Sequence, residues 1–165
     1  MDDELAEFCR REHRRLVAAL HLICGSRPLA EDLAQETFAR VCTDWPRIRA
    51  MESPTGYAHR IGLNLARSSL RRRTIERRVS TQLRNDDTWH DPDAASAVAI
   101  RDALQTLRAE QRRVLVLRYF LDYSVAETAE VLSMPIGSVK THTTRGLSAL
   151  RERLGTAVTA EDLHA

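Results

Sequence analysis

One stretch of the chain gathers arginine in a spacing suited to binding a polyanion. On a helix beginning near Pro54, at 100° per residue, four arginines and one asparagine share a narrow stripe: Arg60, Asn64, Arg67, Arg71 and Arg78. Eight arginines and a single acid, Glu76, occur between positions 59 and 84, although the formal net charge of all 165 residues is only +2. Like charges at this spacing repel one another, whereas a polyanion supplies phosphate contacts and counterion release. The stripe therefore favours nucleic acid, and Asn64 is suited to hydrogen-bonding a base edge.

The other side of this helix bears on two weaker interpretations, a solvated basic face and a membrane surface. Its apolar residues are Tyr57, Ala58, Ile61, Leu65 and Ala66. Because they lack the Trp and Phe character of interfacial helices, the membrane is the poorer choice. A solvated face normally interleaves acids with bases, and this one does not.

A second set of polar residues has the opposite charge. In LAEDLAQETFARVCTDW (29–45), the apolar side is formed by Leu29, Leu33, Phe38, Val41 and Trp45. Asp32, Gln35 and Glu36 project on the other side. Acids near a helix start suit the helix dipole, and an acidic, amide-bearing face also suits docking of a positively charged protein. The residues alone leave both explanations open.

The third set lies in YSVAETAEVLSMPIGSVKTHTTRGLSALRERL (123–154). Ser124 and Glu127 form a capping box that opens a short helix, and SMP (133–135) ends it. Ala129, Ser133 and Val139 match the spacing of a helix-turn-helix. Donors for phosphates and base edges follow at the start of the second helix: Ser138, Lys140, Thr141, Thr144 and Arg145. His142 is interpreted as an ordinary surface histidine, and a generic helical hairpin is the alternative for the whole stretch.

Helices position all three sets. A first helix is predicted over 3–24, and its buried side is formed by Leu5, Phe8, Leu16, Leu20 and Ile23. A second is opened by Pro28 and runs to about Trp45; a third is capped by Ser53 and runs to about Arg73 or beyond. NDDTWHDPD (85–93) is acidic and interrupted by proline, and helical periodicity resumes from about Ala94 to Leu154. We therefore predict an all-α chain of two small helical domains joined by a flexible linker: 1–78, a linker over 79–94, 95–156, and a tail over 157–165.

Composition narrows the class of protein. No apolar run reaches membrane-spanning length and the start, MDDELAEF, is acidic, so we expect a cytoplasmic protein with no membrane partner. The three cysteines, at positions 9, 24 and 42, lack CxxC and metal-binding spacing, and they are interpreted as small buried core residues, with a redox or metal role as the weaker alternative. No nucleophilic triad, phosphate loop or metal-ligand cluster is present, so we expect no catalytic residues, no metal and no cofactor.

Together the motifs resemble a known family. LAEDLAQETFARV and YAHRIGLNLARSSLRRR resemble region two of the bacterial sigma-70 family, and LRAEQRRVLVLRYFLDYSVAETAEVLSMPIGSVKTHTTRGLSALR resembles region four. The order of the two, over about 5–73 and 98–154, is similar to that of the extracytoplasmic-function (ECF) group, and within it to the actinobacterial SigE-type branch. The resemblance implies a promoter-specificity subunit of RNA polymerase with a region-two helical bundle and a region-four helix-turn-helix. The alternative is a free-standing helix-turn-helix regulator, which needs neither DLAQE nor the arginine-rich helix.

The resemblance assigns a role to each set of residues. Asp32, Gln35 and Glu36 fall on the segment that binds the clamp helices of the largest polymerase subunit. Asn64 falls on the family's asparagine that helps to trap a flipped base of the minus-ten element, with Arg60, Arg67 and Arg71 beside the single strand. In region four, the residues expected at the minus-thirty-five element are Ser138, Lys140, Thr141, Thr144 and Arg145, with Arg145 as base reader and Lys140 as phosphate contact.

Further partners follow from the same resemblance. It implies contact with the polymerase flap and with promoter DNA, a linker along the RNA exit path, a monomer when free, and scope for an anti-sigma factor. One feature departs from the family, because the aromatic-rich melting segment is reduced to Tyr57, with Trp45 upstream. We therefore expect stringent promoter choice, with base-pocket residues within 46–56.

Overall fold

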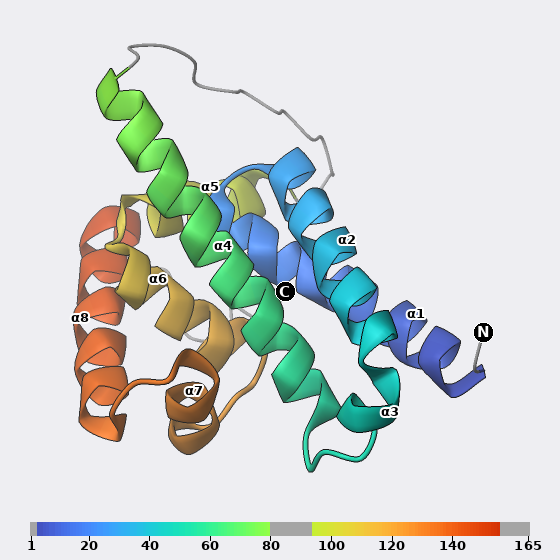
Figure 1. Cartoon of the computed structure of the whole chain (residues 1–165). Coiled ribbons are helices and arrows are strands. Elements are labelled where there is room, and N and C mark those ends of the chain that lie inside the picture. The colour runs from blue at the N-terminus through green and yellow to red at the C-terminus, as the bar shows by residue number, and fades with distance from the viewer. Residues whose placement is uncertain (1–2, 80–93, 156–165) are drawn as a thin grey trace. The chain divides into compact units, whose positions relative to one another are not determined.

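The computed structural model describes residues 3–79 and 94–155, and they form two compact helical units (Figure 1). The division falls between Asp87 and Thr88. All the elements in the described ranges are helices, which confirms the all-α prediction. Most of the predicted linker and the whole predicted tail lie outside these ranges, so the linker's flexibility and the domain limits remain predictions.

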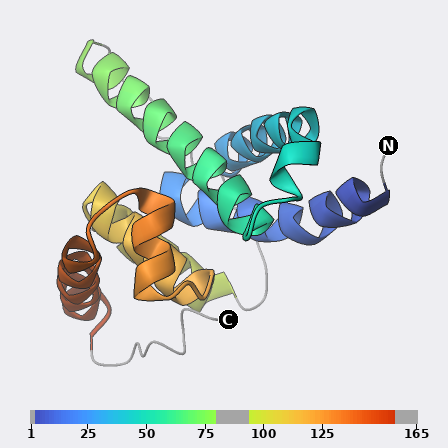
Figure 2. The same ribbon diagram turned by 60° about the horizontal axis from the view of Figure 1, so that its bottom comes forward.

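The N-terminal unit is a bundle of three long helices and one short one. Its elements are α1 (Asp3–Cys24), α2 (Arg27–Thr43), α3 (Trp45–Ile48) and α4 (Pro54–Val79). The apolar sides predicted for the first two helices are buried as expected: Leu5, Phe8, Leu16, Leu20, Ile23, Leu29, Leu33, Phe38, Val41 and Trp45. The last described turns of α4 project away from α1 and α2 (Figure 2), and residues 71–75 are all exposed.

Short polar signals begin and end these helices. The Ser26 side chain accepts a hydrogen bond from the Leu29 amide, so α2 starts one residue before the predicted Pro28. The Ser53 hydroxyl accepts from the Gly56 amide at 3.1 Å and caps α4 as predicted. The second helix does not continue to Trp45. It ends at Thr43, Asp44 separates it from the next helix, and Trp45 is the first residue of α3.

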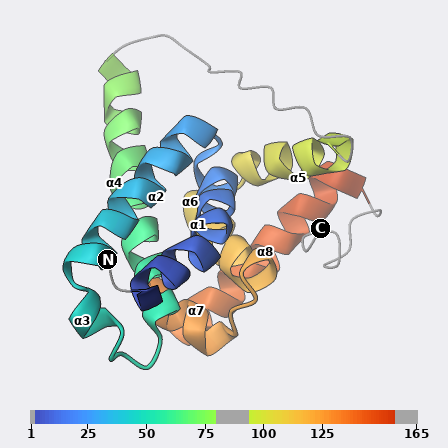
Figure 3. The same cartoon turned by 90° about the vertical axis from the view of Figure 1, so that its right-hand side faces the viewer.

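The C-terminal unit stacks short helices around α8. Its elements are α5 (Ala94–Thr106), α6 (Ala109–Leu115), η1 (Val116–Phe120), α7 (Val125–Leu132) and α8 (Ile136–Leu154), shown from the side in Figure 3. The Arg112 guanidinium joins α6 to the end of α5 by donating to the carbonyl oxygens of Leu104 and Leu107 at 2.9 and 3.0 Å. The core between α6, α7 and α8 centres on Val114, Ala129 and Val139. These contacts hold α8 in place.

The cysteines are not core residues, so that interpretation was wrong. Cys9 and Cys24 are partly exposed and Cys42 is exposed. The core instead uses larger apolar side chains at neighbouring positions, such as Phe8 and Val41, and leaves the cysteines at its border.

Candidate nucleic-acid and protein interfaces

The arginine stripe of α4 faces solvent. Asn64, Arg67 and Arg71 are exposed and Arg60 is half-exposed; we call these four residues the α4 basic face. No described residue forms an ion pair with Arg67 or Arg71, so their charges are available to an anion. Because Arg78 lies where no side chain is described, its place in the stripe remains a prediction.

The buried side of α4 differs from the one that the sequence predicted. Ala58 and Ala66 are buried as expected, but Tyr57, Ile61 and Leu65 are only half-buried. The buried residues of α4 are Gly56, Ala58, His59, Gly62, Leu63 and Ala66. The contact surface is therefore rotated by roughly one residue position around the helix.

Small residues explain this rotation. A Cβ atom added at Gly62 would lie 3.1 Å from Leu16 Cδ1 and 3.2 Å from Thr37 Oγ1. With glycine at the centre and Ala58 and Ala66 beside it, the α4 backbone approaches α1 and α2 closely. Larger side chains such as Ile61 are excluded from that centre and lie at its edge.

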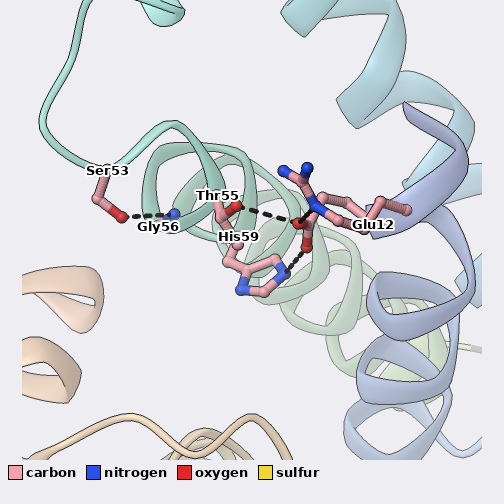
Figure 4. A network of polar contacts seen from close by, with 6 residues as sticks. Glu12, Ser53, Thr55, Gly56 and His59 are labelled. Carbon is pink, nitrogen blue, oxygen red and sulfur yellow. Dashed lines mark hydrogen bonds and ion pairs between the residues drawn. The ribbon is translucent and has the colours of Figure 1, made fainter. Parts of the chain in front are cut away.

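A buried polar network ties the start of α4 to α1 (Figure 4). Glu12 is 5% exposed, and its Oε1 accepts hydrogen bonds from Thr55 Oγ1 at 3.1 Å and from Arg11 Nε at 2.9 Å. Its Oε2 lies 3.9 Å from Nε2 of His59, which is 1% exposed. Burial lowers the pKa of His59 to about 4, although the Glu12 carboxylate acts in the opposite direction, so the imidazole is neutral near pH 7. The network fixes the first turn of α4 and thereby orients its basic face.

The two aromatic residues of the expected melting segment have different environments. Trp45 is 5% exposed and its ring packs against Phe8 with centroids 5.1 Å apart, so it cannot stack on a base. Tyr57 is half-buried, and the Arg47 guanidinium lies 5.4 Å from its ring centroid and donates to its hydroxyl at 2.9 Å. The sequence did not single out Arg47, which adds a positive charge two turns before Asn64 on the side of α4 that carries Tyr57. The one indication in the sequence was the position of Arg47 within 46–56, the segment expected to hold base-pocket residues.

The acidic residues of α2 form a second exposed face. Asp32, Gln35 and Glu36 are all exposed; we call them the α2 acidic face. The Glu36 carboxylate accepts a hydrogen bond from Arg40 at 2.6 Å on the same helix. The helix-dipole explanation fails, because the first turn of α2 contains no acid and the dipole acts within that turn.

The helix-turn-helix of the C-terminal unit is built as its motif predicts. The Ser124 hydroxyl accepts from the Glu127 amide at 3.1 Å, and the Glu127 carboxylate accepts from the Ser124 amide at 2.7 Å. Ser133 ends α7 in the left-handed conformation, with φ 51° and ψ 48°, a geometry that glycine adopts at lower cost. Gly146 lets α8 lie against α6, since an added Cβ would be 2.9 Å from Leu115 Cδ1.

The exposed side of α8 carries the predicted donors. Lys140, Thr141, Thr144 and Arg145 are exposed and Ser138 is half-exposed; we call these five residues the α8 face. The Thr141 hydroxyl donates to the Gly137 carbonyl at 2.9 Å, and the Thr144 hydroxyl donates to the Lys140 carbonyl at 3.1 Å. Each hydroxyl is thus left with an acceptor lone pair for an external donor. His142 is half-buried.

The described residues also bear on two other kinds of site, a membrane-spanning segment and a metal centre. Across 3–79 and 94–155, no helix is long and apolar enough to cross a membrane. In the same ranges, no group of three or more His, Cys, Asp or Glu side chains is arranged to hold a metal ion.

Known proteins match both units. Residues 8–75 match the family model for sigma-70 region 2, and residues 97–150 match that for sigma-70 region 4. The chain is 31% identical over 155 residues to the RNA polymerase sigma-E factor of Streptomyces coelicolor, covering 92% of this chain and 86% of that protein. It is 28% identical over 167 residues to the ECF RNA polymerase sigma factor SigW of Bacillus subtilis, covering 92% and 89%.

Solved structures share the fold. The sigma factor RpoE of Bartonella quintana, crystallised with the anti-sigma factor NepR, superposes with a TM-score of 0.83 at 20% identity, covering 94% of this chain and 99% of that one. CnrH, in complex with the cytosolic domain of CnrY, superposes with a TM-score of 0.69 at 19% identity, covering 96% and 92%.

Proposed function

The chain belongs to the ECF group of the sigma-70 family of RNA polymerase sigma factors, and we propose how its three exposed faces divide the work of initiation. The N-terminal unit carries region two and the C-terminal unit carries region four. The α2 acidic face docks on core polymerase, the α4 basic face engages the minus-ten element, and the α8 face reads the minus-thirty-five element. The chain selects promoters and carries out no catalytic step itself.

The observation that carries the proposal is the exposed asparagine within an arginine stripe on α4. Arg67 and Arg71 provide charge for a phosphate backbone, which positions DNA without reading its sequence. Asn64 lies between Arg60 and Arg67 on the same face and provides both a donor and an acceptor for a base edge. A single strand pulled from the duplex presents both features to this face, phosphates and unstacked bases.

Promoter recognition by the α8 face follows similar physical rules. Arg145 offers two parallel donors suited to guanine O6 and N7, and Lys140 offers a point charge suited to a phosphate. Thr141 and Thr144 contribute acceptor lone pairs, and Ser138 contributes a hydroxyl near the start of α8, the end of a recognition helix that enters the major groove.

Polymerase docking by the α2 acidic face separates this function from that of a free-standing regulator. A repressor or activator that binds DNA alone has no use for exposed Asp32, Gln35 and Glu36, or for the α4 basic face. We propose the clamp helices of the largest subunit as the partner of α2, the flap as a partner of region four, and the RNA exit path as the course of the linker. The working compartment is then the cytoplasm, where core polymerase acts.

An anti-sigma factor is a further proposed partner. Of the two similar solved structures, RpoE was crystallised with the anti-sigma factor NepR, and CnrH is in complex with the cytosolic domain of CnrY. Such an inhibitor would keep the factor inactive by covering the faces that polymerase needs, and the factor without it would be a monomer. A pull-down of the chain from native cells would identify this partner.

The docking assignment is tested by binding to native core polymerase. Replacing Asp32 and Glu36 with alanine removes two exposed carboxylates from α2, and we expect affinity for core to fall at least tenfold, by about 1.4 kcal/mol or more. The matched control, Glu4→Ala with Glu7→Ala, removes the same charge from exposed positions of α1. Equal binding by both double variants, with unchanged helix content, would refute docking through α2.

A further inference from the structure

Two cysteines face each other across the α1–α2 interface. The helices are joined by a short turn and run antiparallel side by side (Figures 1 and 3). Their register is fixed by the ring of His13, which packs against the ring of Phe38 with centroids 5.7 Å apart. One helical turn further, four residues back on α1 and four residues on along α2, the corresponding residues are Cys9 and Cys42.

A second contact brackets the pair from the other side. Phe8, next to Cys9 in the chain, packs against Trp45 with ring centroids 5.1 Å apart. Trp45 follows Cys42 by three residues and begins α3. The two thiols therefore lie between a ring contact of α1 with α2 and a ring contact of α1 with α3. Neighbouring helices packed at this spacing can bring opposed Cβ atoms within the range of a disulfide.

The thiols are reduced, adjacent and unequal. Neither Cys9 nor Cys42 is in a disulfide, Cys9 is partly buried and Cys42 is exposed. Burial raises the pKa of Cys9 to about 11, and the neighbouring Cys42 thiol raises it further through a charge interaction and a hydrogen bond. Cys42 is therefore open to an oxidant from solvent, whereas Cys9 is held protonated beside it.

We propose that Cys9 and Cys42 are an oxidation site for hydroperoxides, at which an intramolecular disulfide forms and is later reduced. The Cys42 thiol gives up its proton, and the thiolate attacks the outer oxygen of the peroxide. The O–O bond breaks, and the leaving hydroxide or alkoxide takes up that proton and departs as water or an alcohol, with Cys42 as sulfenic acid. The Cys9 sulfur then displaces that hydroxyl, which leaves as water with the Cys9 proton, and the S–S bond forms. A dithiol reductant returns both thiols by exchange and is itself oxidised to a disulfide.

The third cysteine, Cys24, lies too far from Cys9 and Cys42 to take part in the reaction. Cys24 ends α1, and a rise of 1.5 Å per residue places it about 22 Å along the helix from Cys9. It cannot join the pair within one folded chain. It therefore serves as an internal control with a comparable, partly exposed environment.

Disulfide formation also changes the surface beside the α2 acidic face. Cys42 lies two turns after Gln35 on the same exposed side of α2. The bond would join α1 to α2 at the border of that face, a consequence that rests on the proposed docking. The formation of the disulfide does not depend on docking, and it is measured without polymerase.

The test uses the purified full chain, fully reduced and then exposed to hydrogen peroxide at low micromolar protein concentration. Remaining thiols are alkylated, and intact mass with peptide mapping locates any bond. We expect wild type and Cys24→Ser to lose two hydrogen atoms and to yield one peptide pair joined through Cys9 and Cys42. A dithiol reductant should restore every thiol.

The single variants separate the two steps. Cys9→Ser should stop at a Cys42 sulfenic acid that dimedone traps, and Cys42→Ser should resist the same dose of peroxide. A bond involving Cys24, disulfide-linked dimers as the main product, or free thiols throughout in wild type would each overturn the proposal. Failure of polymerase docking leaves these outcomes unchanged, so the two proposals are refuted separately.

Discussion

The buried imidazole of His59 makes the stability of region two depend on pH in a way that the structure allows to be calculated. The pKa of His59 is about 4 in the folded chain, against an ordinary value of 6.5. Between these values the unfolded chain binds a proton at His59 that the folded chain does not bind. The free energy of unfolding therefore falls as the pH is lowered through this window, and the contribution is fully present above the unfolded value.

The size of the effect follows from the shift. Each pKa unit corresponds to about 1.4 kcal/mol, so acidification from about pH 7 to about pH 4.5 should cost region two about 2 kcal/mol through His59 alone. Carboxylates also titrate over part of this range, so the quantity to measure is a difference between variants. His59→Gln keeps a polar side chain of similar size but cannot bind the proton.

Urea unfolding followed by Trp45 fluorescence provides the assay. Trp45 is buried in region two, and a Trp89→Phe background leaves it as the single tryptophan of the chain. We expect wild type to lose about 2 kcal/mol more than His59→Gln over this pH range. His142→Gln, which removes a histidine from the other unit, should behave as wild type. Parallel pH profiles for wild type and His59→Gln would refute the reasoning about the buried network.

Other predictions concern region four. Gly146→Ala places a methyl group 2.9 Å from buried Leu115, so urea unfolding followed by circular dichroism should show region four destabilised by about 1–2 kcal/mol. Gly137→Ala is the matched control on the same helix: nothing lies within 4 Å, and we expect a gain of about 0.5 kcal/mol from helix propensity. Arg145→Ala should lower transcription to an extent that depends on the minus-thirty-five sequence, measured on promoter variants; the same loss on every variant would exclude base reading by Arg145.

The sequence predicted the helices well because their signals are local. Caps at Ser53 and Ser124 and the apolar periodicity of α1 and α2 depend on residues within a few positions of one another. The burial of the predicted apolar side of each of these two helices confirmed those patterns. The residues of the α4 basic face and of the α8 face could be predicted for the same reason.

The packed side of α4 and the buried polar network depend on which helices pack together, and local periodicity does not give this information. On α4, small residues at 58, 62 and 66 rather than large ones define the packed side, so a count of apolar residues chose a side rotated from the true one. Glu12 lies within the apolar stripe of α1, four residues after Phe8 and four before Leu16, and this position was the available signal for a buried carboxylate. Its partner His59 becomes evident only when α1 and α4 are packed together.

The cysteines illustrate the same limit. Cys9 and Cys42 are far apart in the sequence and lack any motif spacing, and their juxtaposition depends on the register of α1 against α2. Ser133 is a smaller case: the turn was predicted, whereas the left-handed conformation of a serine there follows from the helix pair that it joins.

The central claim is that this chain directs core RNA polymerase to promoters through regions two and four. The most direct measurement is transcription in vitro from native genomic DNA by purified core with and without the chain, with every RNA 5′ end sequenced. We expect initiation with the chain at discrete sites that share two upstream motifs at a fixed separation, and loss of those sites with Asn64→Ala. Unchanged 5′ ends on addition of the chain, or start sites without a shared motif, would contradict the account.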